Sequence, residues 1–192
     1  MLTAELNPAF TLADAKAAGL RKDQVYAMLA AGEIERAGRG VYLRPDSIDP
    51  AFAALAATTA IQDSATMCLT SALVYHGLSD AIPFTTDIAL PRRTRFPAGV
   101  EHVRWHSFAP ETFLIGRECH EVAAKTTVAV YSGERAIVDC FRLMHQEGSD
   151  VAYEALRRWL HRKGNSPSQL LQVASSFPKA EPRLRHALEV LL

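Results

Sequence analysis

The sequence has few of the features that would place it at a membrane or outside the cell. No apolar run in its 192 residues approaches the roughly 20 residues of a membrane-spanning helix. The three cysteines (Cys68, Cys119, Cys140) show no short spacing, so they indicate a reducing compartment and no disulfide framework. The start, MLTAELNPAF, lacks the basic and apolar regions of a signal peptide. We therefore expect a cytoplasmic protein without a membrane partner.

Net charge is also lacking, because 21 Lys and Arg balance 21 Asp and Glu. The whole chain thus has no basic signature of nucleic-acid binding. Along the chain, however, the charges are segregated: residues 46–91 contain five Asp and no Lys or Arg, whereas residues 92–117 contain five Arg and two Glu. Such segregation allows local basic surfaces on a neutral protein.

Motifs of known chemistry are missing as well. The sequence has no Gly-rich phosphate loop, no GxSxG and no pair of carboxylates at a useful spacing. Cys119 and His120 are adjacent, and His102 and His106 lie four apart in a predicted strand, where about 13 Å would separate them. We expect no metal, no cofactor and no enzymatic activity. Arg135 and Asp139, four apart on a predicted helix, indicate an ion pair.

The stretch TLADAKAAGLRKDQVYAMLAAG predicts two short helices separated by Gly19. Thr11 and Asp14 resemble a capping box at the start of the first helix. The apolar stripe of the second helix consists of Val25, Met28 and Leu29. A helix, a short turn containing glycine and a second helix form the helix-turn-helix arrangement.

The next stretch, IERAGRGVYLRP (34–45), predicts a hairpin with an arginine near its tip. Gly38 and Gly40 let the chain fold back, and Arg39 lies between them. A helix-turn-helix followed by a hairpin is a winged helix, which we predict over residues 1–46. Its first helix is short here, little more than LTAEL (2–6).

In a winged helix the second helix can enter the major groove of DNA while the hairpin reaches the neighbouring backbone. Arg21 stands at the start of the second helix, where a cation is unfavourable against the helix dipole, and this suggests an external anionic partner. Asp23 opposes such a contact. The predicted DNA contacts of the second helix and the hairpin are Arg21, Lys22, Gln24, Tyr26, Arg36, Arg39 and Arg44.

The remaining residues, 47–192, predict a mixed domain with a small sheet and several helices, so the fold class is α+β. PDSIDP (45–50) indicates a linker. β-forming stretches separated by Pro and Gly fill residues 84–131. The predicted helices cover residues 51–62, 66–76, 133–146, 150–163, 167–176 and 182–192.

Residues 10–45, CLTSALVYHGLSD (68–80), DIALPRRTR (87–95) and YSGERAIVDCFRL (131–143) together resemble the AbiEi-type antitoxins. These are the transcriptional regulators of bacterial abortive-infection (type IV) toxin–antitoxin systems. The resemblance implies a winged helix that binds inverted repeats in its own promoter and represses it, and a role in phage defence. It also implies a C-terminal domain that counters a nucleotidyltransferase toxin without a stable complex. Arg92, Arg93 and Arg95 match a basic turn of that domain.

Two other functions remain open. Winged helices also serve as protein-docking modules. Separately, PRRTR (91–95) is either a solvated turn or a phosphate clamp. A related architecture joins a winged helix to a restriction-like endonuclease. That chemistry needs a Glu-x-Lys strand to hold a divalent metal, and in the nearest stretch, HEVAAK, the lysine is misplaced.

Overall fold

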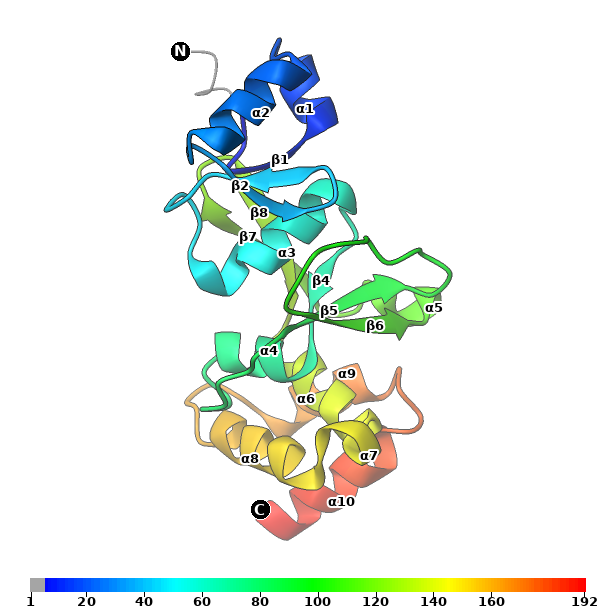
Figure 1. Ribbon diagram of the computed structural model, residues 1–192. Coiled ribbons are helices and arrows are strands. Elements are labelled where there is room, and N and C mark those ends of the chain that lie inside the picture. Colours follow the sequence, from blue (N-terminus) through cyan, green and yellow to red (C-terminus); the bar gives the residue numbers. More distant parts are fainter. Residues whose placement is uncertain (1–5) are drawn as a thin grey trace.

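The computed structural model describes residues 6–192 and shows an elongated α+β molecule (Figure 1). An N-terminal unit lies at one end, a sheet with its helices lies in the middle, and the last helices lie at the other end. The described residues form ten helices and eight strands. The predicted fold class is therefore confirmed.

The N-terminal unit runs in the order strand, helix, helix and hairpin. Its elements are β1 (Ala9–Thr11), α1 (Leu12–Ala17), α2 (Lys22–Ala30), β2 (Glu35–Gly38) and β3 (Val41–Leu43). β3 lies between β1 and β2 in an antiparallel sheet. A small core of its own consists of Leu6, Phe10, Ala15, Leu20, Val25, Ile34 and Tyr42. The two expected helices and the hairpin are present; the winged-helix assignment and the domain boundary at residue 46 stay predictions.

Helix α1 begins as the sequence predicts. The Thr11 hydroxyl accepts a hydrogen bond from the Asp14 backbone N–H at 3.2 Å, and the Asp14 carboxylate accepts one from the Thr11 N–H at 2.7 Å. These two bonds form the predicted capping box. Gly19 follows the helix with φ +83°, a conformation that glycine takes without steric cost. Of the short first helix expected at 2–6, residues 2–5 lie outside the described chain.

The middle of the molecule is a mixed sheet in the order β6-β5-β4-β8-β7. Its strands are β4 (Thr66–Met67), β5 (Thr86–Pro91), β6 (Val103–Phe108), β7 (Arg117–Ala123) and β8 (Thr126–Tyr131). β5 pairs with β6, and β4 with β8, in parallel; β4–β5 and β7–β8 are antiparallel. In this register Ile88 is opposite Trp105 and Cys119 is opposite Ala129.

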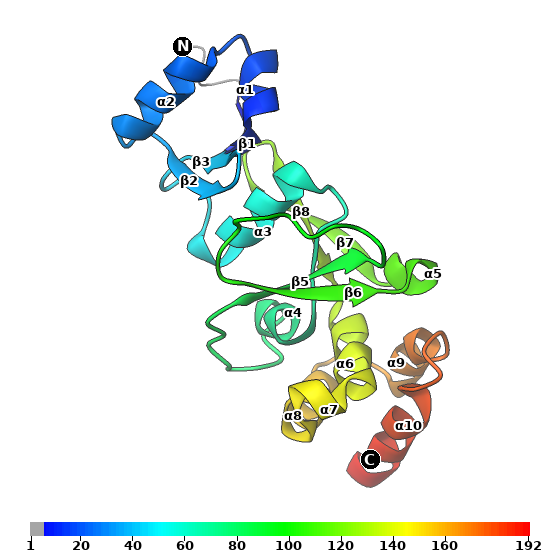
Figure 2. The same cartoon turned by 45° about the vertical axis from the view of Figure 1, so that its right-hand side comes forward.

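Helices pack around this sheet and extend the molecule beyond it. They are α3 (Pro50–Ile61), α4 (Leu69–Tyr75), α5 (Pro110–Phe113), α6 (Gly133–Arg142), α7 (Met144–Glu147), α8 (Ser149–Leu160), α9 (Pro167–Ala174) and α10 (Glu181–Leu191). Helix α6 is the central one, with both Ile137 and Phe141 fully buried, and it contacts α4, α8 and α9. Figure 2 shows α7 to α10 grouped at the end farthest from the N-terminal unit. Within residues 6–192, no helix combines the length and the apolar character needed to cross a membrane.

Helix α3 joins the two parts of the molecule. It packs against β1 and β3 and also against β5 and β8. The Asp49 carboxylate caps its first turn by accepting a hydrogen bond from the Ala51 N–H at 2.9 Å, and Pro50 is its first residue. Ile48 packs against the large core. The segment predicted as a linker is therefore followed directly by a helix that packs against both parts of the molecule.

The sequence pattern does not predict β1, β4 and α5, which are all short. The helix predicted over residues 66–76 begins only at Leu69. Thr66 and Met67 instead form the central strand β4, which pairs on one side with β5 and on the other with β8. A strand of two residues has no periodicity of its own, so only the tertiary pairing identifies it.

Candidate nucleic-acid interface

Helix α2 begins beside a cation that already has a carboxylate next to it. Arg21 donates two hydrogen bonds to Asp23, from Nε at 3.1 Å and from Nη2 at 3.0 Å. These bonds lower the pKa of the Asp23 carboxyl below its ordinary value. Both side chains are largely exposed, 74% and 68%. The sequence suggested an external anion for Arg21; the chain itself supplies an anion, in an exposed pair that another anion can replace at little cost.

The other predicted residues of α2 divide into two roles. The Gln24 side-chain oxygen accepts a hydrogen bond from the Arg21 backbone N–H at 2.8 Å, which fixes the start of the helix. Only this half of a capping box exists, because a guanidinium has no acceptor for the reciprocal bond. Lys22 lies with Nζ 5.5 Å from the centre of the Tyr26 ring, and that ring is 47% exposed. Arg21, Lys22 and Tyr26 are thus open to a ligand, whereas Gln24 is half-buried.

The β2–β3 hairpin presents two exposed arginines. Arg39 occupies the turn, next to Gly40 with φ +76°. Arg36 donates from Nε to the Gly38 carbonyl at 3.2 Å, and this bond holds its guanidinium along the hairpin. Arg44 has a different place: at the other end of β3, it is half-buried and donates to the Leu6 carbonyl at 3.1 Å.

The hairpin tip packs on the loop between β5 and β6. The Arg39 N–H donates to the Ala98 carbonyl at 3.4 Å. A Cβ added at Gly38 would lie 3.0 Å from a Val100 methyl group, and one added at Gly99 would lie 3.2 Å from the Arg39 nitrogen. The two segments approach closely because Gly38 and Gly99 have no Cβ.

The same loop begins with the basic turn, residues 91–95. The Thr94 N–H donates to the Pro91 carbonyl at 3.0 Å, and Arg93 has φ +74°. This is the type II arrangement, whose third residue is usually glycine. Arg92, Arg93 and Arg95 are exposed and form no ion pair within the described chain.

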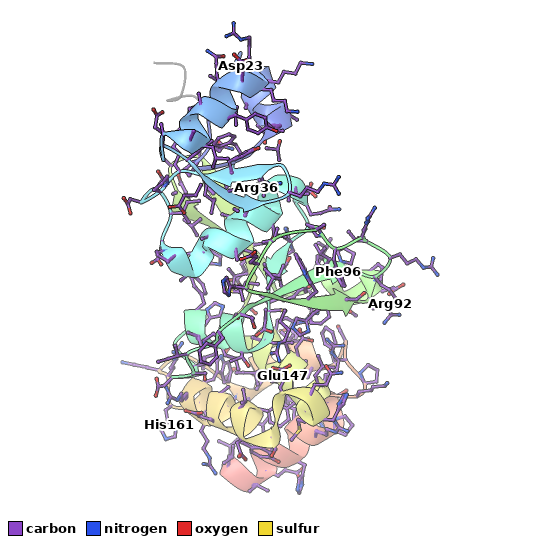
Figure 3. The ribbon with its side chains drawn as sticks, in the orientation of Figure 1. Asp23, Arg36, Arg92, Phe96, Glu147 and His161 are labelled. Atoms are coloured by element: carbon purple, nitrogen blue, oxygen red, sulfur yellow. The ribbon has the colours of Figure 1, made fainter. Side chains whose placement is uncertain are left out.

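Beyond the basic turn, Phe96 stacks on Trp105 with ring centres 5.3 Å apart and holds the loop to the sheet. Figure 3 shows Asp23 on α2, Arg36 on the hairpin, and Phe96 and Arg92 on the loop, following one another along the molecule. The hairpin therefore packs on residues 98–100 of the same loop whose first residues form the basic turn. Arg44 does not join this group.

A polar network around the buried carboxylates of Asp87 and Glu147 fixes β6, into which the loop leads. Arg104 donates to Asp87 at 2.5 Å and to Glu147 at 2.6 Å. The His106 ring nitrogen lies 2.9 Å from Asp87, and Ser71 donates to Asp87 at 3.3 Å from both its N–H and its hydroxyl. Burial by itself raises the pKa of Asp87, but the hydrogen bonds from His106 and Arg104 outweigh it and bring the pKa below its ordinary value.

The histidines and cysteines considered for metal binding are dispersed. In the described part of the chain, no three His, Cys, Asp or Glu side chains gather closely enough to hold a metal ion. His106 contacts Asp87, His102 is exposed with φ +57°, and Cys119 is exposed. Cys68 and Cys140 are buried as expected, and burial raises the pKa of both thiols.

Sequence reasoning found the arginines and missed the contact between the hairpin and the loop. The one signal of this contact in the sequence is Gly38, a second glycine in the hairpin. Only Gly40 has the positive φ that the turn requires, so Gly38 has no such role in the turn and serves close packing. The sequence does not say which segment takes up the space beside it.

Residues 2–45 match the model of the family described as "Transcriptional regulator, AbiEi antitoxin". Most of the matched range consists of β1, α1, α2 and the β2–β3 hairpin. The resemblance inferred from the sequence is therefore confirmed for this part of the chain. No curated protein matches the chain.

Proposed function

We propose that this protein is a DNA-binding autorepressor and the antitoxin of a type IV toxin–antitoxin operon, with inverted repeats in its own promoter as its operator. The family match over residues 2–45 supports the regulator and antitoxin roles. The observation that carries the DNA-binding part is the contact between the hairpin and the β5–β6 loop. Through this contact the hairpin that carries Arg36 and Arg39 lies against residues 98–100 of the loop whose first residues form the basic turn, and the exposed arginines of both segments are available to DNA.

In the proposed complex the start of α2 lies in the major groove. Lys22 and Tyr26 meet base edges or phosphates there, and Arg21 exchanges Asp23 for a phosphate. Arg36 and Arg39 contact the backbone beside the groove. The arginines of the basic turn extend this track along the duplex, where they set affinity and orientation but not sequence preference.

The protein acts by binding, without catalysis, and works in the cytoplasm. It counters its nucleotidyltransferase toxin without a stable complex between the two. Repression follows from occupancy of the promoter, since a bound protein excludes other proteins from the same DNA. A palindromic operator requires two copies, one on each half-site.

The first test is a gel shift on the DNA immediately upstream of the gene, at two salt concentrations, with a scrambled duplex as competitor. We expect specific retardation that weakens steeply with salt, because each neutralised phosphate contributes about −0.9 to the slope of log K against log salt. Arg39→Ala should lower the affinity while the protein remains folded, because the side chain is exposed.

Arg157→Ala is the matched control, since Arg157 is an exposed arginine on α8, outside the proposed surface. It should bind like the wild type. No retardation at micromolar protein, or equal loss in both variants, would refute the proposal and favour a protein-docking role for the N-terminal unit.

A further inference from the structure

A large cavity lies between the hairpin and the rest of the molecule. Its volume is about 970 Å³, at the upper end of the range for small-molecule sites. The wall is shared by the hairpin, by α3 and α4, and by the segments 83–86 and 99–102. The cavity therefore lies where the hairpin packs on α3 and on the β5–β6 loop.

Most of the lining is apolar. Phe52, Met67, Val74 and Tyr75 form much of the wall, and Phe84 stands at the rim with 95% of its surface exposed. An exposed phenylalanine beside an apolar cavity favours an occupant that covers it, since full burial of such a side chain is favourable. The occupant should thus have an apolar, preferably aromatic, body.

The charged residues of the lining indicate which polar group the occupant carries. They are Arg36, Arg39 and Glu101, two cations and one anion. Within the described residues none of these three side chains forms an ion pair. The cavity is therefore net positive on the side of the hairpin, and an acidic group is the complement to it.

We propose that this cavity binds a small aromatic anion, whose acidic group contacts Arg36 and Arg39 and whose body packs on α3 and α4. The proposal rests on the proposed DNA binding for its regulatory consequence. The same two arginines face the ligand and the DNA backbone, so the ligand and the phosphates compete for them. A bound anion then lowers the affinity of the protein for its operator. By linkage, bound DNA lowers the affinity for the anion by the same factor.

The probe is 8-anilinonaphthalene-1-sulfonate, an aromatic anion whose fluorescence rises in an apolar site. Its uncharged counterpart, N-phenyl-1-naphthylamine, has the same rings without the sulfonate. Titrated into the folded full-length protein without DNA, the sulfonate should saturate a single site and bind about tenfold more tightly than the amine, a factor that corresponds to ~1.4 kcal/mol. Equal affinities for the two, or no saturable site, would overturn the proposal.

Variants locate the site. Val74→Phe and Ala54→Leu each fill part of the cavity and should abolish binding. A thermal melt checks that each variant is folded, and the second variant keeps the test valid if the first does not fold. Arg36→Gln should lower the affinity for the sulfonate and leave the affinity for the amine unchanged. Arg157→Gln on α8 should change neither affinity. Unchanged binding in the folded cavity variants would overturn the assignment.

DNA binding is then measured with and without the sulfonate. We expect it to lower the affinity of the wild type about tenfold and to leave Val74→Phe unaffected. If the sulfonate binds saturably but does not change the DNA affinity, the proposed competition is wrong and the cavity site is retained. If the protein binds no DNA at all, the titrations without DNA still decide whether the site exists. Dimerisation through the cavity, seen by sedimentation as a dimer that Val74→Phe dissociates, would assign it to a second copy and overturn the proposal.

Discussion

Arg93 combines an unfavourable backbone conformation with an exposed charge, so replacing it by glycine should move stability and DNA binding in opposite directions. Its φ of +74° is the left-handed region. A non-glycine residue pays about 1–2 kcal/mol to adopt that region. Glycine removes this cost but adds about 0.4–1 kcal/mol of chain entropy to the unfolded state. The difference between the midpoints of these two ranges gives an expected gain of about 0.8 kcal/mol for Arg93→Gly.

For a chain of 192 residues, such a gain corresponds to a rise of about 1–4 °C in the melting temperature. The same substitution removes one exposed guanidinium from the basic turn. DNA affinity should therefore fall, and the slope of log K against log salt should become shallower by about 0.9 if Arg93 contacts one phosphate. Calorimetry and anisotropy titrations on the same preparation measure the two effects.

Arg92→Gly is the matched control, because it removes the same charge one residue earlier, where φ is not positive. It should weaken DNA binding similarly but lower the melting temperature. If both variants lose stability, the strain argument is wrong. If Arg93→Gly binds DNA as the wild type does, the basic turn lies outside the interface.

Three further predictions concern individual carboxylates. Asp139→Asn should destabilise the protein by about 3–5 kcal/mol in urea titrations, because Asp139 and Arg135 form a fully buried ion pair; a smaller effect would mean that the remaining contacts of Arg135 compensate. The pKa of Asp87 is lowered in the folded protein, so its stabilising contribution is present above the ordinary carboxyl pKa and is lost as the pH falls through the lowered value. Melting temperatures of Asp87→Asn should consequently depend less on pH below about pH 4 than those of the wild type. Asp23→Asn should raise DNA affinity several-fold, because it frees Arg21 and removes an opposing charge; an unchanged affinity would place the start of α2 away from the DNA.

Local patterns predict the helices other than α5, the four longer strands and the capping box at Thr11, since each depends on neighbours in the sequence. The same holds for the arginine clusters and for the ion pair of Arg135. The pattern does not predict that this pair is fully buried, with the Arg135 guanidinium 4.3 Å from the Tyr131 ring and 4.4 Å from the Phe177 ring. Those contacts join segments far apart in the chain.

In the candidate site, too, local sequence predicts some features, and others depend on tertiary contacts. The sequence indicates Arg39 because it lies between the two glycines of the turn and Arg36 because it lies on an arm of the hairpin, and it indicates the basic turn because three arginines cluster there. The contact between the hairpin and the β5–β6 loop arises from a close approach of Gly38 and Gly99, and neither glycine specifies its partner. Likewise, Arg44 belongs to the same basic stretch, but its tertiary hydrogen bond to Leu6 removes it from the exposed group.

Hydroxyl-radical footprinting of the DNA upstream of the gene tests the central claim most directly. The account predicts two protected stretches that coincide with an inverted repeat, lost together in the double variant Arg36→Ala/Arg39→Ala and retained in Arg157→Ala. Uniform cleavage at micromolar wild-type protein, or protection that survives removal of both hairpin arginines, would contradict it.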